Sequence, residues 1–233
     1  MKTRFEHLWY FVGLITSDGC LCRDGSHINL TSKDHSFLEV LRNTLRITNR
    51  IGTKIGGSGS VSFQIQMGNK TLHRFLQQVG LTPAKSLTLG VLNIPIQRFP
   101  DFLRGMIDGD GCILTWIHSS NGRRQWALHI SSASPVFASW LKLSIETFFG
   151  VRGRMHVREG RGSRHPLYIV KFGKLPAQVI LRACYYAGCV AMPRKFSRAL
   201  QCIATPNGMR KYGDVVAGVA KLVSAGALKA PGR

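Results

Sequence analysis

Two segments of the chain share one pattern: an apolar run with a glycine inside it that ends in Asp-Gly-Cys. The first copy runs from Tyr10 to Leu21 and the second from Phe102 to Ile113. Each copy predicts a buried helix that stops at Asp-Gly and leads into a strand, because glycine suits the left-handed residue that closes a helix. An Asp at that end faces the negative carbonyl pole of the helix and is repelled unless a cation lies between them.

Small residues lie four apart inside each copy, so that each pair shares one face of its helix. They are Gly13 and Ser17 in the first copy and Gly105 and Gly109 in the second. Such pairs let two helices approach closely. If the helices pack through these faces, Asp18 and Asp110 finish side by side.

The order of the predicted elements repeats after each copy, which indicates two related halves. Asp110 follows Asp18 by 92 residues (110 − 18), and Lys195 follows Lys85 by 110 (195 − 85). We predict an α+β fold of two pseudo-symmetric αββαββα halves, packed through the two motif helices and each carrying an antiparallel sheet. The halves span residues 1–89 and 98–205, with a linker at 90–97 and a weakly structured basic tail at 206–233.

The first half is less regular than the second at one place. Residues 51–59 are rich in glycine and predict a turn, with only a weak position for a strand near residues 52–56. Residues 60–67 then alternate as a strand. Val61, Phe63, Ile65 and Met67 are expected to point inward.

The amino-acid composition limits the kinds of partner molecule that the protein is expected to bind. The 233 residues carry 32 Lys and Arg against 11 Asp and Glu, a net charge of +21. This excess favours a polyanionic partner, nucleic acid ahead of an anionic membrane surface. The six cysteines form no even framework, so buried free thiols in a reducing intracellular compartment are expected; a zinc site that includes Cys20 and Cys22 is the alternative. The longest apolar run, residues 8–15, is too short to span a bilayer, and no secretory signal is recognised.

The two Asp-Gly segments resemble the motif of the LAGLIDADG homing endonucleases, in the single-chain form that carries two copies. The resemblance covers roughly residues 5–205, and Thr16 stands where the motif has its first Asp. It implies that Asp18 and Asp110 are catalytic metal ligands, assisted by the carbonyls of Gly19 and Gly111. Carboxylates suit Mg²⁺; Mn²⁺ is an alternative, and Ca²⁺ is an ion that can bind without supporting cleavage. A pair of Asp-Gly helix ends without any metal is the simpler structural alternative.

Other site residues are also implied by the resemblance. Lys85 and Lys195, at matching places after Pro83 and Pro193, are candidates for electrostatic support of catalysis; the alternative is a solvated lysine at a helix start. Ser32 and Ser132 follow the second strand of each half, where related enzymes place a polar residue in the water network.

The outward residues of the strands form the predicted DNA-binding surface, since a two-stranded ribbon fits the major groove. The alternative is an ordinary solvated sheet face. In the first half these residues are Arg23, His27, Asn29, Lys33, Ser62, Gln64 and Gln66. In the second half they are Thr115, His118, Arg124, Gln125, His129, Arg154, His156, Arg158 and Lys171.

The sequence therefore predicts a monomeric endonuclease that makes a metal-dependent double-strand cut in a long, asymmetric DNA site, encoded in an intron. Two other functions stay open on the same fold. One is an intron RNA-splicing cofactor with host intron RNA as its partner, and the other is a sequence-specific DNA-binding regulator that does not cut. Retention of both Asp residues favours cutting.

Overall fold

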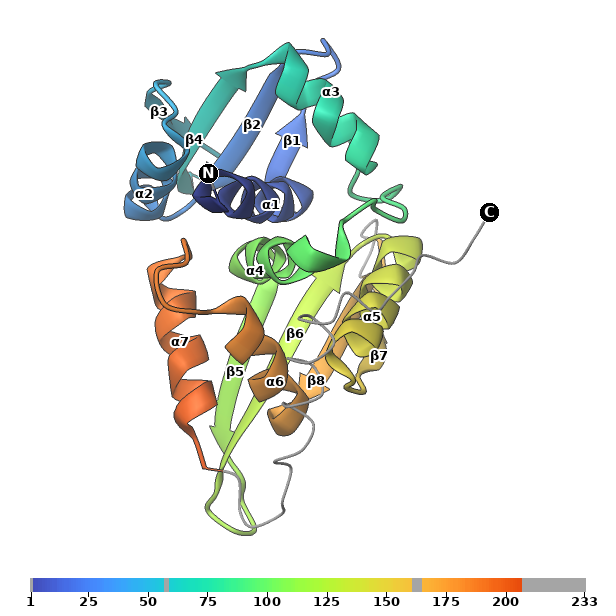
Figure 1. Cartoon of the computed structure of the whole chain (residues 1–233). Helices are drawn as coiled ribbons and strands as arrows, with labels where there is room; N and C mark the ends of the chain where they lie inside the picture. Colours follow the sequence, from blue (N-terminus) through green and yellow to red (C-terminus); the bar gives the residue numbers. More distant parts are fainter. Residues whose placement is uncertain (1, 57–58, 161–164, 207–233) are drawn as a thin grey trace.

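The computed structural model describes residues 2–56, 59–160 and 165–206, so the tail predicted at 206–233 lies outside it apart from Pro206. Two four-stranded antiparallel sheets lie at opposite ends, and two helices meet between them (Figure 1). The predicted α+β fold of two related halves, packed through the motif helices, is confirmed.

The first half consists of α1 (Lys2–Ser17), β1 (Gly19–Leu21), β2 (His27–Ser32), α2 (His35–Leu45), β3 (Ile51–Ile55), β4 (Val61–Gly68) and α3 (Lys70–Val79). Its strands are ordered β1-β2-β4-β3. Asp34 and Asn69 begin α2 and α3, because each side chain accepts a hydrogen bond from the backbone N–H three residues later. Gly80 ends α3 in the left-handed conformation that favours glycine.

The second half follows a short 3₁₀ turn, η1 (Ile96–Arg98). It consists of α4 (Phe99–Gly109), β5 (Gly111–Ile117), β6 (Arg124–Ser132), α5 (Pro135–Phe149), β7 (Arg154–Arg158), β8 (Leu167–Gly173), α6 (Lys174–Cys184) and α7 (Pro193–Ala204). Its strands are ordered β5-β6-β8-β7, the same arrangement as in the first sheet. In the part of the chain that the structure describes, the second half differs from the first by having α7 after the element that matches α3.

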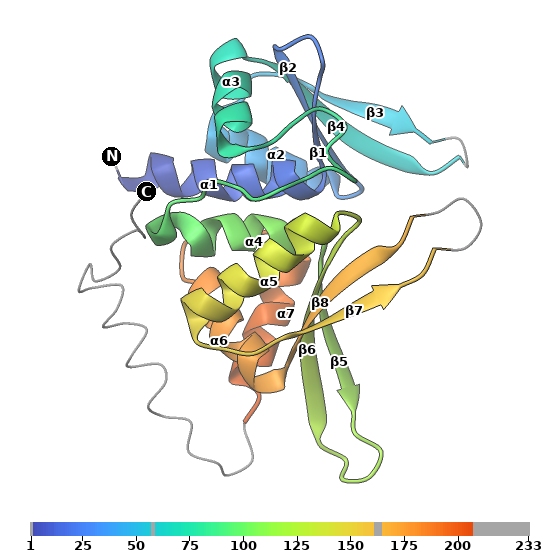
Figure 2. The ribbon, with the colours of Figure 1, turned by 90° about the vertical axis from the view of Figure 1, so that its right-hand side faces the viewer.

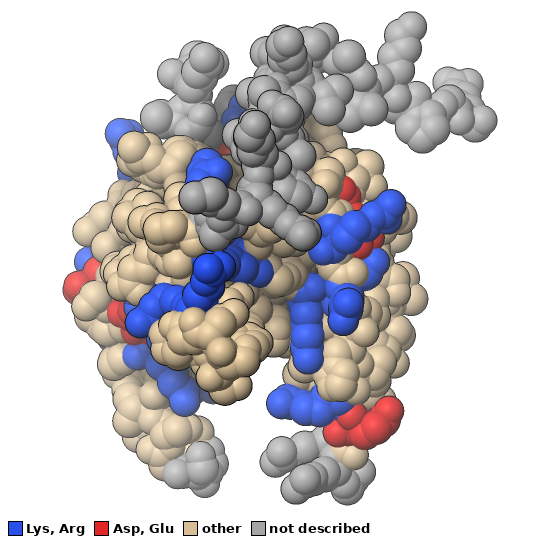
Figure 3. Space-filling view, turned by 90° about the horizontal axis from the view of Figure 1, so that it is seen from below, with Lys and Arg blue, Asp and Glu red and all other residues tan. Residues whose placement is uncertain are grey.

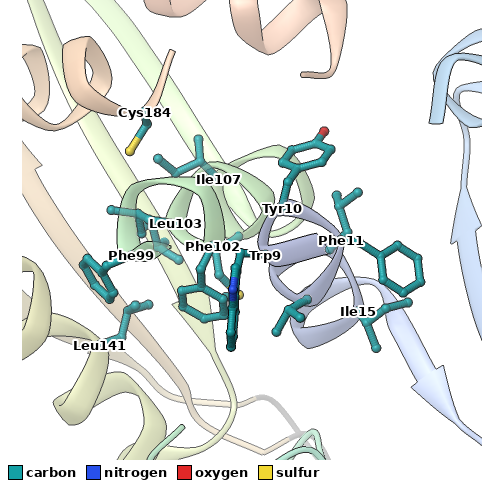
Figure 4. Close-up of a cluster of buried hydrophobic side chains, with 14 of the residues drawn as sticks. Trp9, Tyr10, Phe11, Ile15, Phe99, Phe102, Leu103, Ile107, Leu141 and Cys184 are labelled. Atoms are coloured by element: carbon teal, nitrogen blue, oxygen red, sulfur yellow. The ribbon is translucent and has the colours of Figure 1, made fainter. Parts of the chain in front are cut away.

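The halves meet where α1 crosses α4. A Cβ added to Gly13 would lie 2.1 Å from the carbonyl oxygen of Phe102, and one added to Gly105 would lie 2.2 Å from that of Tyr10. These glycines therefore allow backbone to touch backbone. Aromatic and aliphatic side chains fill the space around this crossing, among them Trp9, Phe99 and Leu103 (Figure 4).

Three features of the fold depart from the sequence predictions. Residues 51–55 form strand β3, which pairs with β4, whereas the sequence indicated only a weak strand there within a glycine-rich turn. Val61 is exposed, because β4 extends beyond the helices that cover the rest of its inward face. The segment around Lys195 is the first turn of helix α7, which the αββαββα order did not include.

Candidate functional site

Asp18 and Asp110 each occupy the position directly after a motif helix. Their backbone N–H groups continue the helical ladders, bonding to Leu14 O at 2.9 Å and Met106 O at 3.0 Å. The ends of α1 and α4 are in contact: a Cβ on Gly109 would lie 3.0 Å from an Asp18 carboxylate oxygen and would clash with Ser17. The close packing of the two helices therefore brings both carboxylates to one place.

Asp18 and Asp110 are both exposed residues, but neighbouring protein atoms partly desolvate their carboxylates. Burial raises the pKa of Asp18. Burial, and then the negative charge of Asp18, raise the pKa of Asp110 to about 6. Two carboxyls that resist ionisation at the negative ends of two helices form a site that a cation would stabilise.

Lys85 and Lys195 lie beside this pair, and each is only 6% exposed. Lys85 donates from Nζ to the carbonyl of Gly19, and Lys195 donates to the carbonyls of Gly111 and, at 2.9 Å, Ile107. Burial lowers the pKa of both ammonium groups. The alternative of solvated lysines is therefore wrong, and the two halves build the same lysine–carbonyl contact.

Each aspartate interacts with the lysine charges of both halves. Burial raises the pKa of Asp18, and the strongest charge opposing that rise is Lys195 of the other half. For Asp110, burial and the charge of Asp18 raise the pKa, and Lys85 is the strongest of the charges that lower it. The lysine of the opposite half therefore lowers the pKa of each aspartate more than the lysine of its own half does, although each lysine donates its hydrogen bonds within its own half.

A cavity of about 320 Å³ opens beside Asp110 and Lys85. Its polar lining also comes from both halves: Thr16, Ser17, Ser86, Ser131 and Ser132. At roughly 30 Å³ for each water molecule of the liquid, it has room for several waters.

Two groups of predicted residues have other contacts. The carbonyls of Gly19 and Gly111 accept from lysine ammonium groups, whose charge opposes a metal ion at the same oxygens. Ser32 and Ser132 accept hydrogen bonds of 3.1 Å from the backbone N–H two residues on, at the turns that lead into α2 and α5. Of these two serines, Ser132 also lines the cavity.

Sequence alone did not single out Ser131 and Arg194 near the site, and it predicted that a change at Asp108 acts through packing or stability. Ser131 lines the cavity, and the charge of Arg194 adds to those that lower the pKa of Asp18. Asp108 lies fully buried two residues before Asp110 and accepts hydrogen bonds from Tyr10, Tyr185 and the Met192 N–H. Its position in the second motif, where the first motif has Thr16, was the available signal.

The outward face of the first sheet carries an amide network. Gln64 donates to Asn29 at 3.3 Å, and Asn29 donates to the sulfur of Cys22 at 3.3 Å. Gln64 and Gln66 line a hollow of about 520 Å³ with Lys54 of the neighbouring strand β3 and with Arg50, which directly precedes that strand. Ser62 donates to the Lys54 carbonyl, while Arg23 and Lys33 are exposed. At the hairpin turn, Nδ1 of His27 lies 2.6 Å from a carboxylate oxygen of Asp24.

The outward face of the second sheet is basic and carries most of its predicted residues. Cross-strand pairs place Gln125 opposite Trp116, and His129 opposite Lys171, which itself pairs with Arg154. His156 and Arg158 follow on the same face of β7 and are exposed, as is His118 in the hairpin turn. Burial and the charge of Lys171 lower the pKa of His129.

Two of the predicted residues are on the wrong face. Thr115 pairs with buried Trp126, which lies on the face that the helices cover. Arg124, two residues before Trp126, shares that face and donates to the Thr115 hydroxyl at 3.4 Å. Because side chains alternate along a strand, neither points outward with Gln125 and His129.

The outward faces bound a common hollow. The hairpins β3–β4 and β7–β8 project toward the same side, the side on which α1 and α4 end (Figure 2). In the space-filling view, Lys and Arg side chains gather around the hollow that opens at the lower centre, and acidic side chains lie toward its margins (Figure 3).

No group of three or more His, Cys, Asp or Glu that could hold a metal ion occurs among the described residues. All six cysteines are free: Cys184 and Cys202 are buried as expected, whereas Cys20 and Cys112 are exposed, against expectation. In the same described part of the chain, no helix has the length and apolar character needed to cross a membrane.

No protein-family model matches the chain, and no curated protein matches it. Solved structures with a similar fold include the homing endonuclease I-WcaI bound to its DNA recognition sequence, with a TM-score of 0.58, 8% identity, and coverage of 83% of this chain and 85% of that one. For I-DmoI in complex with DNA and Ca the TM-score is 0.53, with 13% identity and coverage of 84% and 97%. For full-length DUF199/WhiA from Thermatoga maritima it is 0.55, with 15% identity and coverage of 96% and 67%.

The similarity to these solved structures assigns the chain to a fold class. The chain has the LAGLIDADG homing-endonuclease fold, which these solved endonucleases share with DUF199/WhiA. At these identities the comparison establishes the architecture, and the chemistry has to be argued from the residues of this chain.

Proposed function

We propose that this protein is a metal-dependent DNA endonuclease of the homing type, which makes a double-strand cut in a long, asymmetric site. The observation that carries the proposal is the Asp18–Asp110 pair at the meeting point of two related halves, with a buried lysine beside each carboxylate. A protein that only binds has no need for two carboxyls whose pKa values burial raises.

The sheets supply the binding surface in this proposal. Their outward faces carry amides in the first half and histidine, lysine and arginine in the second, which are side chains that contact base edges and phosphates. The net charge of +21 favours the duplex. I-WcaI, which has a similar fold, was solved bound to its DNA recognition sequence. Because one chain holds both unequal halves, it acts as a monomer on an asymmetric site.

A divalent cation fits the carboxylate pair. Asp18 and Asp110 offer hard oxygen ligands, and two negative groups close together favour such an ion. We propose Mg²⁺, with Mn²⁺ as an alternative; the I-DmoI complex, of similar fold, contains Ca with DNA. When bound, divalent ions in such sites activate water and stabilise the leaving oxygen of a phosphodiester.

Side chains of this protein supply the other groups that the proposed reaction needs. Asp18 and Asp110 would hold the divalent ion, and each carboxylate would serve the cleavage of one strand. Lys85 and Lys195 place fixed positive charge where the transition state accumulates negative charge. The cavity beside Asp110, lined by Ser131 and Ser132, has room for the water that the reaction consumes. Gly19 and Gly111 are left out as metal ligands, because lysines occupy their carbonyls.

A second function on this fold is binding without cutting, either as a DNA-binding regulator or as an intron RNA-splicing cofactor. The similarity in fold to DUF199/WhiA favours keeping this candidate. The same basic sheets would serve it, and the Asp pair would then be dispensable.

The test begins with selection of duplexes from a randomised library by the full-length protein, followed by Mg²⁺-dependent cleavage of the selected sites. Asp18→Asn and Asp110→Asn should stop double-strand cleavage and leave binding intact, since they remove negative charge near phosphate. Glu39→Gln, a charge loss at an exposed position on α2, is the matched control and should cut normally. If either Asp variant cuts both strands as the wild type does, the assignment of Asp18 and Asp110 to the active site is wrong. A protein that binds selected sites without cutting any of them would favour the second function.

A further inference from the structure

The hairpin that follows the second motif is longer than its counterpart in the first half. Strand β1 has 3 residues and β5 has 7, while β2 has 6 and β6 has 9. The residue that matches Trp116 in the repeat is Asp24, which already lies in the turn of the first hairpin. The β5–β6 hairpin extends well away from the α1–α4 crossing (Figure 2).

Apolar side chains stand on the outward face of this extension. Trp116 is 47% exposed and Leu114 is 36% exposed. Trp116 pairs with Gln125 and Leu114 pairs with Ala127, so both share the face that carries His129 and Lys171. Their strand neighbours Thr115 and Ile117 point to the opposite face.

The surroundings indicate what this apolar pair contacts. Strands β5, β6, β7 and β8 contain no Asp or Glu, and the same outward face carries Lys171, Arg154 and Arg158. A face of one sign of charge complements the phosphates of a duplex rather than a typical protein surface. On base edges in the major groove, the 5-methyl group of thymine is the apolar group, and apolar side chains contact it.

We propose that Trp116, with Leu114 beside it, recognises thymine methyl groups in the outer part of the half-site bound by the second half. The proposal rests on the proposed function, because it takes duplex DNA as the ligand of this face. Trp116 lies four residues beyond Cys112, about 13 Å at ~3.3 Å per residue. The thymines therefore lie about four base pairs farther from the cut than the base pair nearest Cys112, at ~3.4 Å per pair. The first half has no matching strand and makes no such contact.

The experiment uses duplexes selected by the full-length protein. Uracil, which lacks only the methyl group, replaces thymine at one position at a time, and the dissociation constant is measured at constant salt. The wild-type protein should lose affinity about three- to fivefold at one or two outer positions of one half-site, as expected for one buried methyl group. Uracil in the other half-site at the same distance from the cut should have no such effect.

Trp116→Ala and Trp116→Gln should bind these duplexes more weakly and no longer distinguish thymine from uracil at those positions. Ile117→Ala is the matched control, since Ile117 is 53% exposed on the same strand but points to the opposite face, and it should keep the discrimination. A wild-type protein that binds and cuts selected duplexes without any thymine–uracil difference there would overturn the inference and leave the proposed function standing. Discrimination that survives in both Trp116 variants would also overturn it. Failure to bind any duplex would overturn both proposals.

Discussion

The hydroxyl of Tyr10 donates a 2.6 Å hydrogen bond to the carboxylate of Asp108, across the contact between α1 and α4. Tyr185 donates to the other oxygen of Asp108 at 2.6 Å, and the Met192 N–H donates at 2.7 Å. One fully buried carboxylate thus joins both motif helices to the segment that begins α7. Lys195 lies in the first turn of that helix, so this network also sets the position of a candidate catalytic lysine.

Asp108→Asn should destabilise the protein. The three partners all donate, and an amide offers a single acceptor oxygen with an NH₂ group in place of the other. At least one buried donor loses its partner, at a cost of about 1–3 kcal/mol. We expect a lower Tm and a smaller free energy of unfolding in urea, with DNA binding retained by the protein that folds.

Thr16→Val is the control for this prediction. Thr16 occupies the matching place in the first motif, but its hydroxyl only donates to Val12 O within its own helix. Its loss should cost less than Asp108→Asn. Equal destabilisation by the two substitutions would mean that the Asp108 network adds nothing beyond local packing.

Gly105→Ala adds only a methyl group, yet it should strongly destabilise the protein. The added Cβ would lie 2.2 Å from Tyr10 O and 2.8 Å from Leu14 N, both backbone atoms that cannot turn aside. The helices must separate, which costs about 3 kcal/mol or more. Gly90→Ala has no neighbour within 4 Å of its added Cβ and should leave the Tm nearly unchanged. Thermal melting of both variants tests the prediction; a Gly105→Ala protein with a wild-type Tm would contradict it.

The fold could be predicted from the sequence because the strongest signals were repeated. Glycines four residues from a small partner, and an Asp-Gly stop at the same distance in both copies, predicted the crossing of α1 and α4. Strand β3 was harder to predict, because glycines at residues 52 and 56 lower strand propensity and pairing with β4 overrides it. Helix α7 was not part of the predicted order, although its Pro193 suits the first turn of a helix.

The orientation of side chains was less predictable than the elements. In β5, apolar residues occur on both faces, so hydrophobic alternation did not decide which face was buried. The polar Thr115 was expected outward and Trp116 was not recognised, whereas pairing with buried Trp126 places them the other way. The lysine–carbonyl contacts could not be derived either, because they join residues 66 and 84 positions apart.

Asp110→Asn should stabilise the protein when no metal ion is present. The pKa of Asp110 is about 6 in the folded protein, above the unfolded value of about 3.9. The ionised carboxylate is therefore a destabilising group that the folded state carries above pH 6. The substitution should raise the Tm at pH 7–8, and the gain should fall away between pH 6 and pH 4, where the wild-type carboxyl becomes neutral in the folded state.

Melting curves of both proteins at several pH values, in chelator, measure this difference. Because the carboxyl is partly exposed, the gain should be modest. Added Mg²⁺ should raise the Tm of the wild-type protein and not of the variant, since a ligand stabilises only the state that binds it. A variant that melts below the wild type at pH 8 in chelator would show that Asp110 makes a stabilising contact instead.

The relative influence of the two lysines on the two aspartates predicts which DNA strand each lysine helps to cleave. The charge of Lys85 lowers the pKa of Asp110 more than that of Lys195 does, and the reverse holds for Asp18, so in the proposed mechanism each catalytic unit would combine both halves. Lys85→Met keeps a long apolar stem in a buried position and removes the charge. It should slow cleavage of one strand by about 10²–10³-fold, the typical cost of losing a group that stabilises transition-state charge.

The affected strand should be the same one that Asp110→Asn protects, and Lys195→Met should protect the strand that Asp18→Asn protects. A selected duplex with a different fluorophore at the end of each strand, cut under single-turnover conditions, reports the two rates separately. Thermal melting of each variant confirms that it is folded. If Lys85→Met and Asp18→Asn protect the same strand, the pairing is within a half and the crossed assignment is wrong. If every variant slows both strands equally, the two carboxylates share one ion, because separate ions would leave one strand open to nicking.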